Sequence, residues 1–146
     1  MTSSNVFLPL VRELVETYQA FEGYSSHHVR SMGLTPCQFD IIATLGNTAG
    51  MSFRELGHKT LITKGTLTGV VQRLEEKGLV QCYAAEHDGR SQIIQLTVAG
   101  EGVFNDVFPR HLQHMGAVFG ALDEDEIRQM QAMLQRLHGL LAGEIK

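Results

Sequence analysis

The sequence is poor in cysteine and has no long apolar run, and both shortages exclude broad classes of protein. Only Cys37 and Cys82 occur in 146 residues, so a disulfide framework is excluded and a reducing compartment is expected. No apolar run approaches the ~20 residues that cross a bilayer. The first five residues lack the basic segment of a secretory signal. We therefore expect a cytoplasmic protein without a membrane partner.

The motifs of common enzyme classes are also missing. The sequence contains no phosphate-binding glycine loop, no Gly-x-Ser-x-Gly elbow and no His-Glu-x-x-His pair. The run of carboxylates from Asp123 to Glu126 is explained by a helix start, where the helix dipole favours negative charge. The sequence therefore predicts no catalytic site and no cofactor.

Positive charge is scarce as well. The formal net charge is −4, whereas a protein that binds nucleic acid usually carries a basic stripe. Residues 54–95 hold six Lys or Arg against five Asp or Glu, while the segments on either side are acidic. This least acidic middle part is a weak sign of a nucleic-acid contact, and charge alone does not indicate a nucleic-acid partner.

The sequence does contain a series of helix signals. Hydrophobic residues make up 43% of the chain, and across residues 6–31 they recur at three- and four-residue steps. Thr35, Ser52 and Asp123 each stand three residues before Gln or Glu, which is the capping-box pattern of a helix start. Thr63 is a further expected N-cap. The pattern therefore predicts a mainly helical chain.

One hairpin interrupts the helices. Apolar segments on both sides of a polar break that contains Asp88-Gly89 predict two short strands joined by a turn. The order of elements predicts one domain over residues 1–146, mainly α with a small β-hairpin wing. Within it, a winged helix-turn-helix at residues 34–97 is flanked by helices at residues 5–32 and 98–146. These terminal helices are amphipathic, and a second copy of the chain is the simplest partner to cover them.

The helix that begins after Thr63 has the features of a DNA-reading helix. Its outward residues are Thr63, Lys64, Gly65, Thr66, Thr68, Gly69 and Gln72. Threonine can donate to or accept from a base edge, and it can contact a thymine methyl group. Lysine can reach phosphate or guanine, and the two glycines would let the backbone approach a duplex closely. A solvated helix face is the alternative interpretation.

The turn of the hairpin offers a second DNA contact. Arg90 is expected to project from it into a minor groove, where narrow A·T tracts concentrate negative potential. Asp88 can hold that guanidinium by a charge-assisted bond. An ordinary surface ion pair is the alternative, but the position one hairpin after a helix-turn-helix favours the DNA contact.

These residues resemble the MarR (multiple-antibiotic-resistance regulator) family over nearly the whole chain. The matching pieces are Leu34-Thr35-Pro36-Cys37-Gln38-Phe39, Phe53-Arg54-Glu55-Leu56, Thr66-Leu67-Thr68, Arg73-Leu74-Glu75-Glu76-Lys77-Gly78-Leu79-Val80, Asp88-Gly89-Arg90-Ser91 and Leu96-Thr97-Val98-Ala99-Gly100. The Asp-x-Arg wing followed by Leu-Thr-x-x-Gly is the most specific part.

The resemblance implies a homodimer that binds a pseudo-palindromic operator in double-stranded DNA, usually as a repressor. It also implies release when an effector changes the spacing of the two recognition helices. Thr63, Lys64, Thr66 and Thr68 then occupy recognition-helix positions, and Asp88 and Arg90 match the wing. Arg73, further along the helix, is expected to touch phosphate or to pair with Glu76. Many members carry a basic residue where this chain has Gly69, so one contact is expected to be missing.

Three kinds of effector are compatible with the sequence. The first is a small organic ligand, often an aromatic acid in this family, whose carboxylate would pair with Arg30 or a histidine. The candidate residues are Tyr24, His27, His28 and Arg30, at the end of the first helix. A solvated helix end is the alternative interpretation of the same residues.

A metal and a thiol switch are the other two. His111 and His114 have the i, i+3 spacing of zinc ligands, but no motif completes the set, and solvated histidines are the alternative. Cys37 lies near a helix N-terminus, where a thiol pKa can fall, whereas Cys82 is expected to be a small core residue. Peroxide-sensing members place a cysteine in the first helix, and residues 1–32 contain none.

A winged helix used for protein contacts is the rival to DNA binding. The acidic net charge permits it. Arg90 and the threonine-rich helix argue against it, because a protein-binding face favours aromatic or aliphatic anchors.

Overall fold

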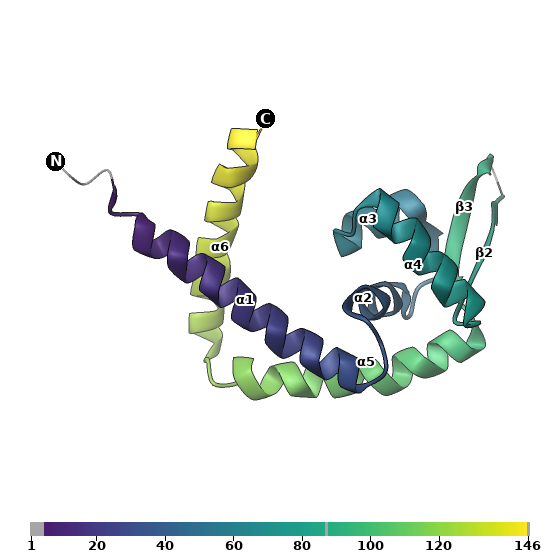
Figure 1. Cartoon of the computed structure of the whole chain (residues 1–146), viewed down its shortest axis with the longest axis horizontal. Coiled ribbons are helices and arrows are strands. Elements are labelled where there is room, and N and C mark those ends of the chain that lie inside the picture. Colours follow the sequence, from purple (N-terminus) through teal and green to yellow (C-terminus); the bar gives the residue numbers. More distant parts are fainter. Residues whose placement is uncertain (1–4, 87, 146) are drawn as a thin grey trace. The chain divides into compact units, whose positions relative to one another are not determined.

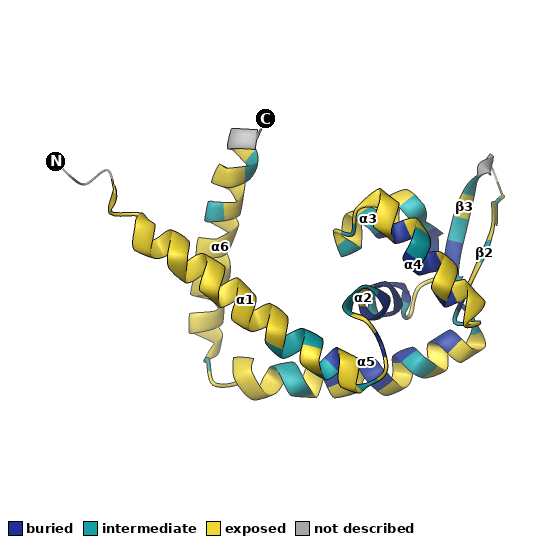
Figure 2. Cartoon of the chain, viewed as in Figure 1, coloured by how far each residue is buried: buried dark blue, intermediate teal, exposed yellow. Residues whose placement is uncertain are grey.

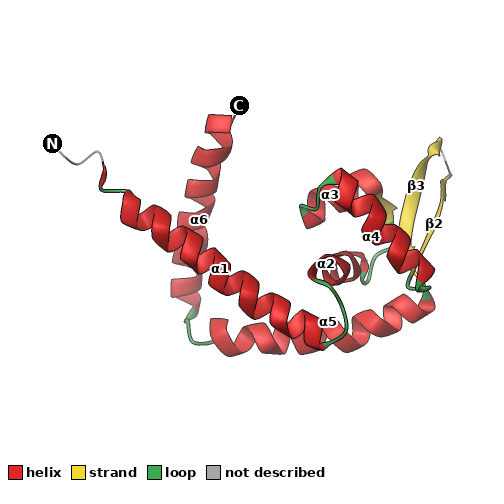
Figure 3. Ribbon diagram, viewed as in Figure 1, coloured by secondary structure: helices red, strands yellow, loops and turns green. Residues whose placement is uncertain are grey.

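The computed structural model describes residues 5–86 and 88–145, apart from the side chains of residues 88–90, 144 and 145. The helices in these residues are α1 (Leu8–Ser31), α2 (Pro36–Leu45), α3 (Phe53–Thr60), α4 (Lys64–Glu76), α5 (Val98–Phe119) and α6 (Glu124–Ile145) (Figure 1). The strands are β1 (Met51–Ser52), β2 (Val80–Ala85) and β3 (Asp88–Leu96) (Figure 3). The mainly helical fold with a β wing is confirmed.

The helix starts follow the capping signals, with two differences. Both capping-box bonds form at Thr35 and at Asp123. At Ser52, only the bond from the Glu55 N–H to Ser52 Oγ forms among the described residues, at 3.1 Å. Thr63 has the extended backbone of an N-cap but makes no capping bond, because its hydroxyl donates to Thr66 Oγ1 at 3.2 Å. Thr63 is thus the N-cap residue of α4, as predicted, but its side chain makes no capping bond.

Glycines in the left-handed conformation end α1 and α4. Gly33 has φ 86° and Gly78 has φ 76°, a region that residues with a Cβ rarely adopt. At the end of α4, the Leu79 N–H donates to the Leu74 carbonyl and the Gly78 N–H to the Glu75 carbonyl. This pair of bonds is the Schellman arrangement, and it turns the chain directly from α4 into β2.

The wing belongs to a sheet of three strands rather than to an isolated hairpin. The strand order is β1-β3-β2, with both pairs antiparallel. Met51 pairs with Ile94 across β1 and β3, while Val80 pairs with Leu96 across β2 and β3. The expectation of two strands missed β1, because two residues are too short to show an alternating pattern. This third strand ties the wing to the residue that caps α3.

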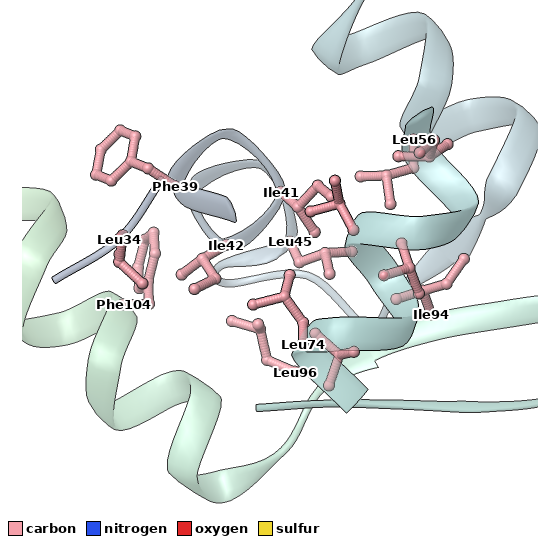
Figure 4. Packing of buried hydrophobic residues seen from close by; sticks show 14 of the residues in the cluster. Leu34, Phe39, Ile41, Ile42, Leu45, Leu56, Leu74, Ile94, Leu96 and Phe104 are labelled. Atoms are coloured by element: carbon pink, nitrogen blue, oxygen red, sulfur yellow. The ribbon is translucent and has the colours of Figure 1, made fainter. Parts of the chain in front are cut away.

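The core lies in the helix-turn-helix part of the chain. Its largest fully buried side chains come from α2, α3, α4 and β3, and they include Ile41, Ile42, Leu45, Leu56, Leu67, Leu74 and Ile94. Figure 4 shows that Phe104 of α5 also contributes to this cluster. A Cβ on Gly46, just after α2, would lie 2.1 Å from the Phe104 ring, so glycine is required for this close approach. The core therefore fixes α4 and the base of the wing.

The chain divides into two compact units, residues 1–111 and 112–146. In the first unit, α1 carries exposed apolar side chains along much of its length (Figure 2). In the second unit, the end of α5 and α6 border a groove of about 440 Å³ whose lining includes Phe119, Ile127, Met130 and Leu134. Among the described residues, no helix is long and apolar enough to cross a membrane.

Candidate DNA-binding surface

Helix α4 has one buried face and one exposed face. Leu67, Val70, Val71 and Leu74 are buried in the core, at the spacing of one helix face. The exposed residues at the N-terminal end are Thr63, Lys64, Gly65, Thr66 and Thr68. The predicted recognition residues are thus gathered on the outside of one helix, and the core holds that helix in place.

The threonine hydroxyls of this face are ordered by local hydrogen bonds. The Thr63 hydroxyl donates to Thr66 Oγ1 at 3.2 Å, and the Thr68 hydroxyl donates to the Lys64 carbonyl at 3.2 Å. Each Oγ keeps a lone pair that can accept a bond from a base edge. These contacts fix the side-chain rotamers, so the face presents defined positions for polar atoms.

Gly65 and Gly69 leave open space on the same helix. A Cβ at either position would meet nothing within 4 Å, so the packing within the chain does not require glycine there. Glycine in a helix interior costs about 0.5–1 kcal/mol relative to alanine. The two positions let another molecule approach the α4 backbone.

Arg73 lies on the exposed side of the last turn of α4. Among the described residues, no carboxylate lies within 4.0 Å of its guanidinium. The alternative in which Arg73 pairs with Glu76 is therefore not what the structure has. The guanidinium is available to a phosphate.

In the wing, the structure describes only the backbone of residues 88–90. Residues 80–84 of β2 pair regularly with residues 92–96 of β3, and the register shifts between Ala84 and Ala85. The side chains of Asp88 and Arg90 lie outside the described part of the chain. Their predicted roles stay predictions, and the backbone places both residues at the start of β3.

The predicted effector residues separate into two pairs at the end of α1. Tyr24 and His28, one turn apart, are half-buried, while His27 and Arg30 are exposed. His28 Nδ1 lies 3.0 Å from Nδ1 of His111 on α5. His28 therefore faces the interior of the first unit, at the junction of α1 and α5.

His111 is the residue of this junction that the sequence did not assign to it. The residue is 8% exposed. Its ring is tilted against Phe39 at 4.6 Å between ring centres, and its Nε2 lies 3.3 Å from Ser25 Oγ. A signal was present, because His111 continues the apolar spacing of Phe104 and Val107 along α5. A buried polar ring among apolar positions needs hydrogen-bond partners, and α1 supplies them.

The metal and thiol interpretations gain little from the geometry. In the part of the chain that the structure describes, no three His, Cys, Asp or Glu side chains gather as metal ligands, and His111 pairs with His28 instead. Cys37 and Cys82 are half-buried and pack against the core. Burial raises the pKa of the Cys82 thiol, and the nearby Glu75 carboxylate raises it further. A raised pKa keeps this thiol protonated and unreactive.

Comparison with known proteins gives the family. The model of the MarR family matches residues 32–91, which span α2 to the start of β3. The HTH-type transcriptional regulator MhqR of Bacillus subtilis is 30% identical over 137 residues, covering 94% of this chain and 93% of its own. The similarity thus extends over the terminal helices as well as the helix-turn-helix.

Two solved structures share the fold. Sco3205, a MarR family regulator from Streptomyces coelicolor solved in complex with DNA, has a TM-score of 0.82 at 21% identity and covers 90% of this chain and 84% of its own. BpsR of Bordetella bronchiseptica, whose DNA binding is regulated by 6-hydroxynicotinic acid, has a TM-score of 0.76 at 22% identity and covers 89% and 98%. At this identity, the likeness concerns the fold.

Proposed function

Because this chain belongs to the MarR family of DNA-binding transcriptional regulators, we propose that it is a repressor that binds a pseudo-palindromic operator as a homodimer. A small organic acid releases it from the DNA. The observation that carries the proposal is the exposed end of α4. There, Lys64, Thr66 and Thr68 stand clear of the core on a helix that the core fixes.

The DNA contacts follow from this placement. The N-terminal end of α4 enters the major groove, where Thr66 and Thr68 meet base edges and Lys64 meets phosphate or guanine. Arg73, which has no described carboxylate within 4.0 Å, contacts phosphate. Arg90 reaches the minor groove from the wing, held by Asp88. The relative Sco3205 is described in complex with DNA, which supports this use of the fold.

The terminal helices support the dimer. The exposed apolar side chains of α1 include Leu10, Val11, Leu14, Tyr18 and Phe21, each at least 36% exposed. Those of α6 include Ile127, Met130, Met133, Leu134, Leu140 and Leu141. Exposed apolar side chains in such number along a helix mark an interface in soluble proteins. A second copy of the chain covers it, which sets the spacing of the two α4 helices.

The effector site lies at the end of α1. Tyr24 and His28 are half-buried near the end of α1, His28 contacts His111 of α5, and Arg30 supplies a guanidinium for a carboxylate. BpsR, a relative by fold, is described as regulated by 6-hydroxynicotinic acid, and this supports an aromatic acid as the ligand class. Bound between α1 and α5, such an acid displaces the His28–His111 contact and changes the position of α1.

Selection from a random-sequence duplex library at two salt concentrations tests the proposal. We expect enrichment of a two-fold-symmetric site with half-sites about one helical turn (~34–36 Å) apart. Affinity should fall steeply with salt, because binding releases counterions. Light scattering should give the mass of two chains. Failure to enrich any site at low salt, by protein that is dimeric and free of ligand, would refute operator binding and favour the protein-contact alternative.

A further inference from the structure

Gln72 is an exposed residue in the second half of α4 that the DNA contacts described above leave unused. The buried face of this helix consists of Leu67, Val70, Val71 and Leu74. Because an α-helix turns by roughly 100° per residue, Gly65 and Gln72 lie on the opposite side of α4, about two turns apart. A duplex that contacts the outside of α4 therefore meets the line from Gly65 to Gln72.

The carboxamide of Gln72 is not used within the described part of the chain. The hydrogen bonds between side chains on the outside of α4 do not include it, and no other residue that the structure describes bonds to it. By contrast, Gln38 completes the capping box of α2, and Gln81 donates to Gln95 Oε1 at 3.3 Å. Gln72 thus keeps a donor and an acceptor for another molecule.

Cationic side chains lie on both sides of Gln72. Viewed down the helix axis, Lys64 lies roughly 80° to one side of Gln72 and Arg73 roughly 100° to the other. Both cations are exposed, and neither has a described carboxylate within 4.0 Å. Phosphates line the edges of the major groove, and base edges form its floor. Cations that contact phosphates on opposite edges point the residue between them at the bases.

Gly65 removes an obstacle on the same line. A Cβ at this position meets nothing within 4 Å in the chain, and alanine is a better helix former. Neither packing nor helix formation therefore explains the glycine. Glycine does allow a backbone to come close to another molecule. Without a side chain at Gly65, α4 lies deeper in the groove, and Gln72 comes within reach of the bases.

Acidic residues mark the end of the surface that faces DNA. Glu75 and Glu76 are exposed in the last turn of α4, and their carboxylates repel phosphate. The contact surface on α4 therefore begins at its N-terminal end and stops at Arg73. Gln72 is the last neutral polar side chain within it.

On the basis of the proposed function, we propose that Gln72 reads an adenine in each half of the operator. Its Nε2–H donates to adenine N7, and its Oε1 accepts from adenine N6–H, a pair of bonds that adenine alone offers in the major groove. Guanine presents two acceptors, N7 and O6, so it leaves the Gln72 oxygen without a donor. Gln72 is then a specificity-determining residue, whereas a phosphate contact by Arg73 supports binding to any sequence.

The test compares the sites that the full-length protein and its Gln72 variants select from a random-sequence duplex library. The unaltered protein should require adenine at one symmetric position of each half-site. Gln72→Ala should bind that site about tenfold more weakly and accept any base at the position. Gln72→Arg should prefer guanine there, because arginine pairs with guanine O6 and N7. A change of preferred base is a result that a merely structural role of Gln72 would not produce.

Removal of one acceptor atom from the DNA locates the contact. 7-Deazaadenine lacks N7, so at the selected position it should weaken binding by the unaltered protein about threefold to tenfold and leave Gln72→Ala unaffected. Gln129→Ala is the matched control, because Gln129 is an exposed glutamine on α6, and it should select the unaltered site. Thermal unfolding should show that every variant folds.

Gly65→Ala tests the close approach of the α4 backbone. The added methyl group should weaken binding to the selected site severalfold, although alanine favours the helix and the melting temperature should not fall. Gly102→Ala on α5 is the control, since a Cβ there also meets nothing within 4 Å, and it should bind as the unaltered protein does. Unchanged affinity of Gly65→Ala would overturn the close approach at this glycine.

Two results would overturn the assignment of Gln72. One is selection of the same site, with the same base preference, by folded Gln72→Ala. The other is equal weakening of the unaltered protein and Gln72→Ala by 7-deazaadenine. In both cases the protein still selects a two-fold-symmetric site, so the proposed function stands. Selection of no site by the unaltered dimeric protein would instead refute the proposed function, and this inference with it.

Discussion

His28 and His111, 83 positions apart in the chain, bring their Nδ1 atoms within 3.0 Å of each other. At this distance the two atoms form a hydrogen bond, and the tautomers of the two rings decide which imidazole donates. The rings also stack, with centres 5.2 Å apart. This contact joins α1 to α5 within the first unit, which also holds α4.

Replacement of His111 should be costly. His111→Ala removes a buried ring that contacts Phe39 and leaves His28 without this partner, and we expect a loss of about 2–4 kcal/mol in the free energy of unfolding. Urea denaturation measures this loss. His27→Ala is the matched control, because His27 is exposed on α1 and should change stability by less than about 0.5 kcal/mol. Equal effects of the two substitutions would contradict a structural role for the pair.

A cation added at Gly69 should strengthen DNA binding. The position is open, since a Cβ there meets nothing within 4 Å, and it lies on α4 next to Thr68. Gly69→Lys should raise affinity for any duplex and increase the salt slope by about one. Gly69→Gln adds similar bulk without charge, so it should leave the salt slope unchanged. Identical slopes for the two variants would show that this side of α4 does not approach phosphate.

Loss of the wing arginine should have the opposite effect. Arg90→Ala should weaken operator binding by about tenfold or more, because it removes a minor-groove contact, while light scattering should still give a dimer. Arg110→Ala provides the control, because it removes the same charge from α5, where Arg110 pairs with Asp106 at 3.1 Å. Normal operator binding by folded Arg90→Ala protein would refute the wing assignment.

The helices and their order could be predicted because their signals are local. Residues 6–31 were expected to be helical, and α1 covers Leu8–Ser31. Thr35 and Asp123 make both expected capping bonds. These signals act within one or two turns of the chain, so the sequence displays them directly.

What could not be predicted depends on contacts between distant residues. Strand β1 exists because Met51 pairs with Ile94, and nothing in the local pattern marks two residues as a strand. The hydroxyl of Thr63 can either accept a capping bond from a backbone N–H or donate to Thr66 Oγ1, and the structure has the second arrangement. The sequence is compatible with both. His28 meets His111 only when α1 and α5 come together in the fold, where Phe39 of α2 also contacts the His111 ring.

The reactivity of Cys82 gives a pH-dependent test of the thiol interpretation. Burial and the charge of Glu75 raise the pKa of this thiol above its ordinary value of 9.0, so the thiolate fraction at any given pH is lower than in the unfolded chain. Alkylation of the folded protein by iodoacetamide should therefore be slow at pH 8 and should rise only at higher pH. Mass spectrometry of Cys82 measures the rate, with the urea-unfolded protein as reference. Faster alkylation of the folded form at pH 8 would revive thiol sensing at this position.

Two glycine-to-alanine substitutions should change stability in opposite directions. At Gly46, a Cβ would lie 2.1 Å from the Phe104 ring, which is fixed in the core, so Gly46→Ala should cost about 1–3 kcal/mol of unfolding free energy. At Gly23, inside α1, a Cβ meets nothing within 4 Å, so Gly23→Ala should add about 0.5–1 kcal/mol. Urea denaturation of both variants measures the difference. A Gly46→Ala protein as stable as Gly23→Ala would mean that Phe104 can move away from α2, and the anchoring of α5 to the DNA-binding part would then be loose.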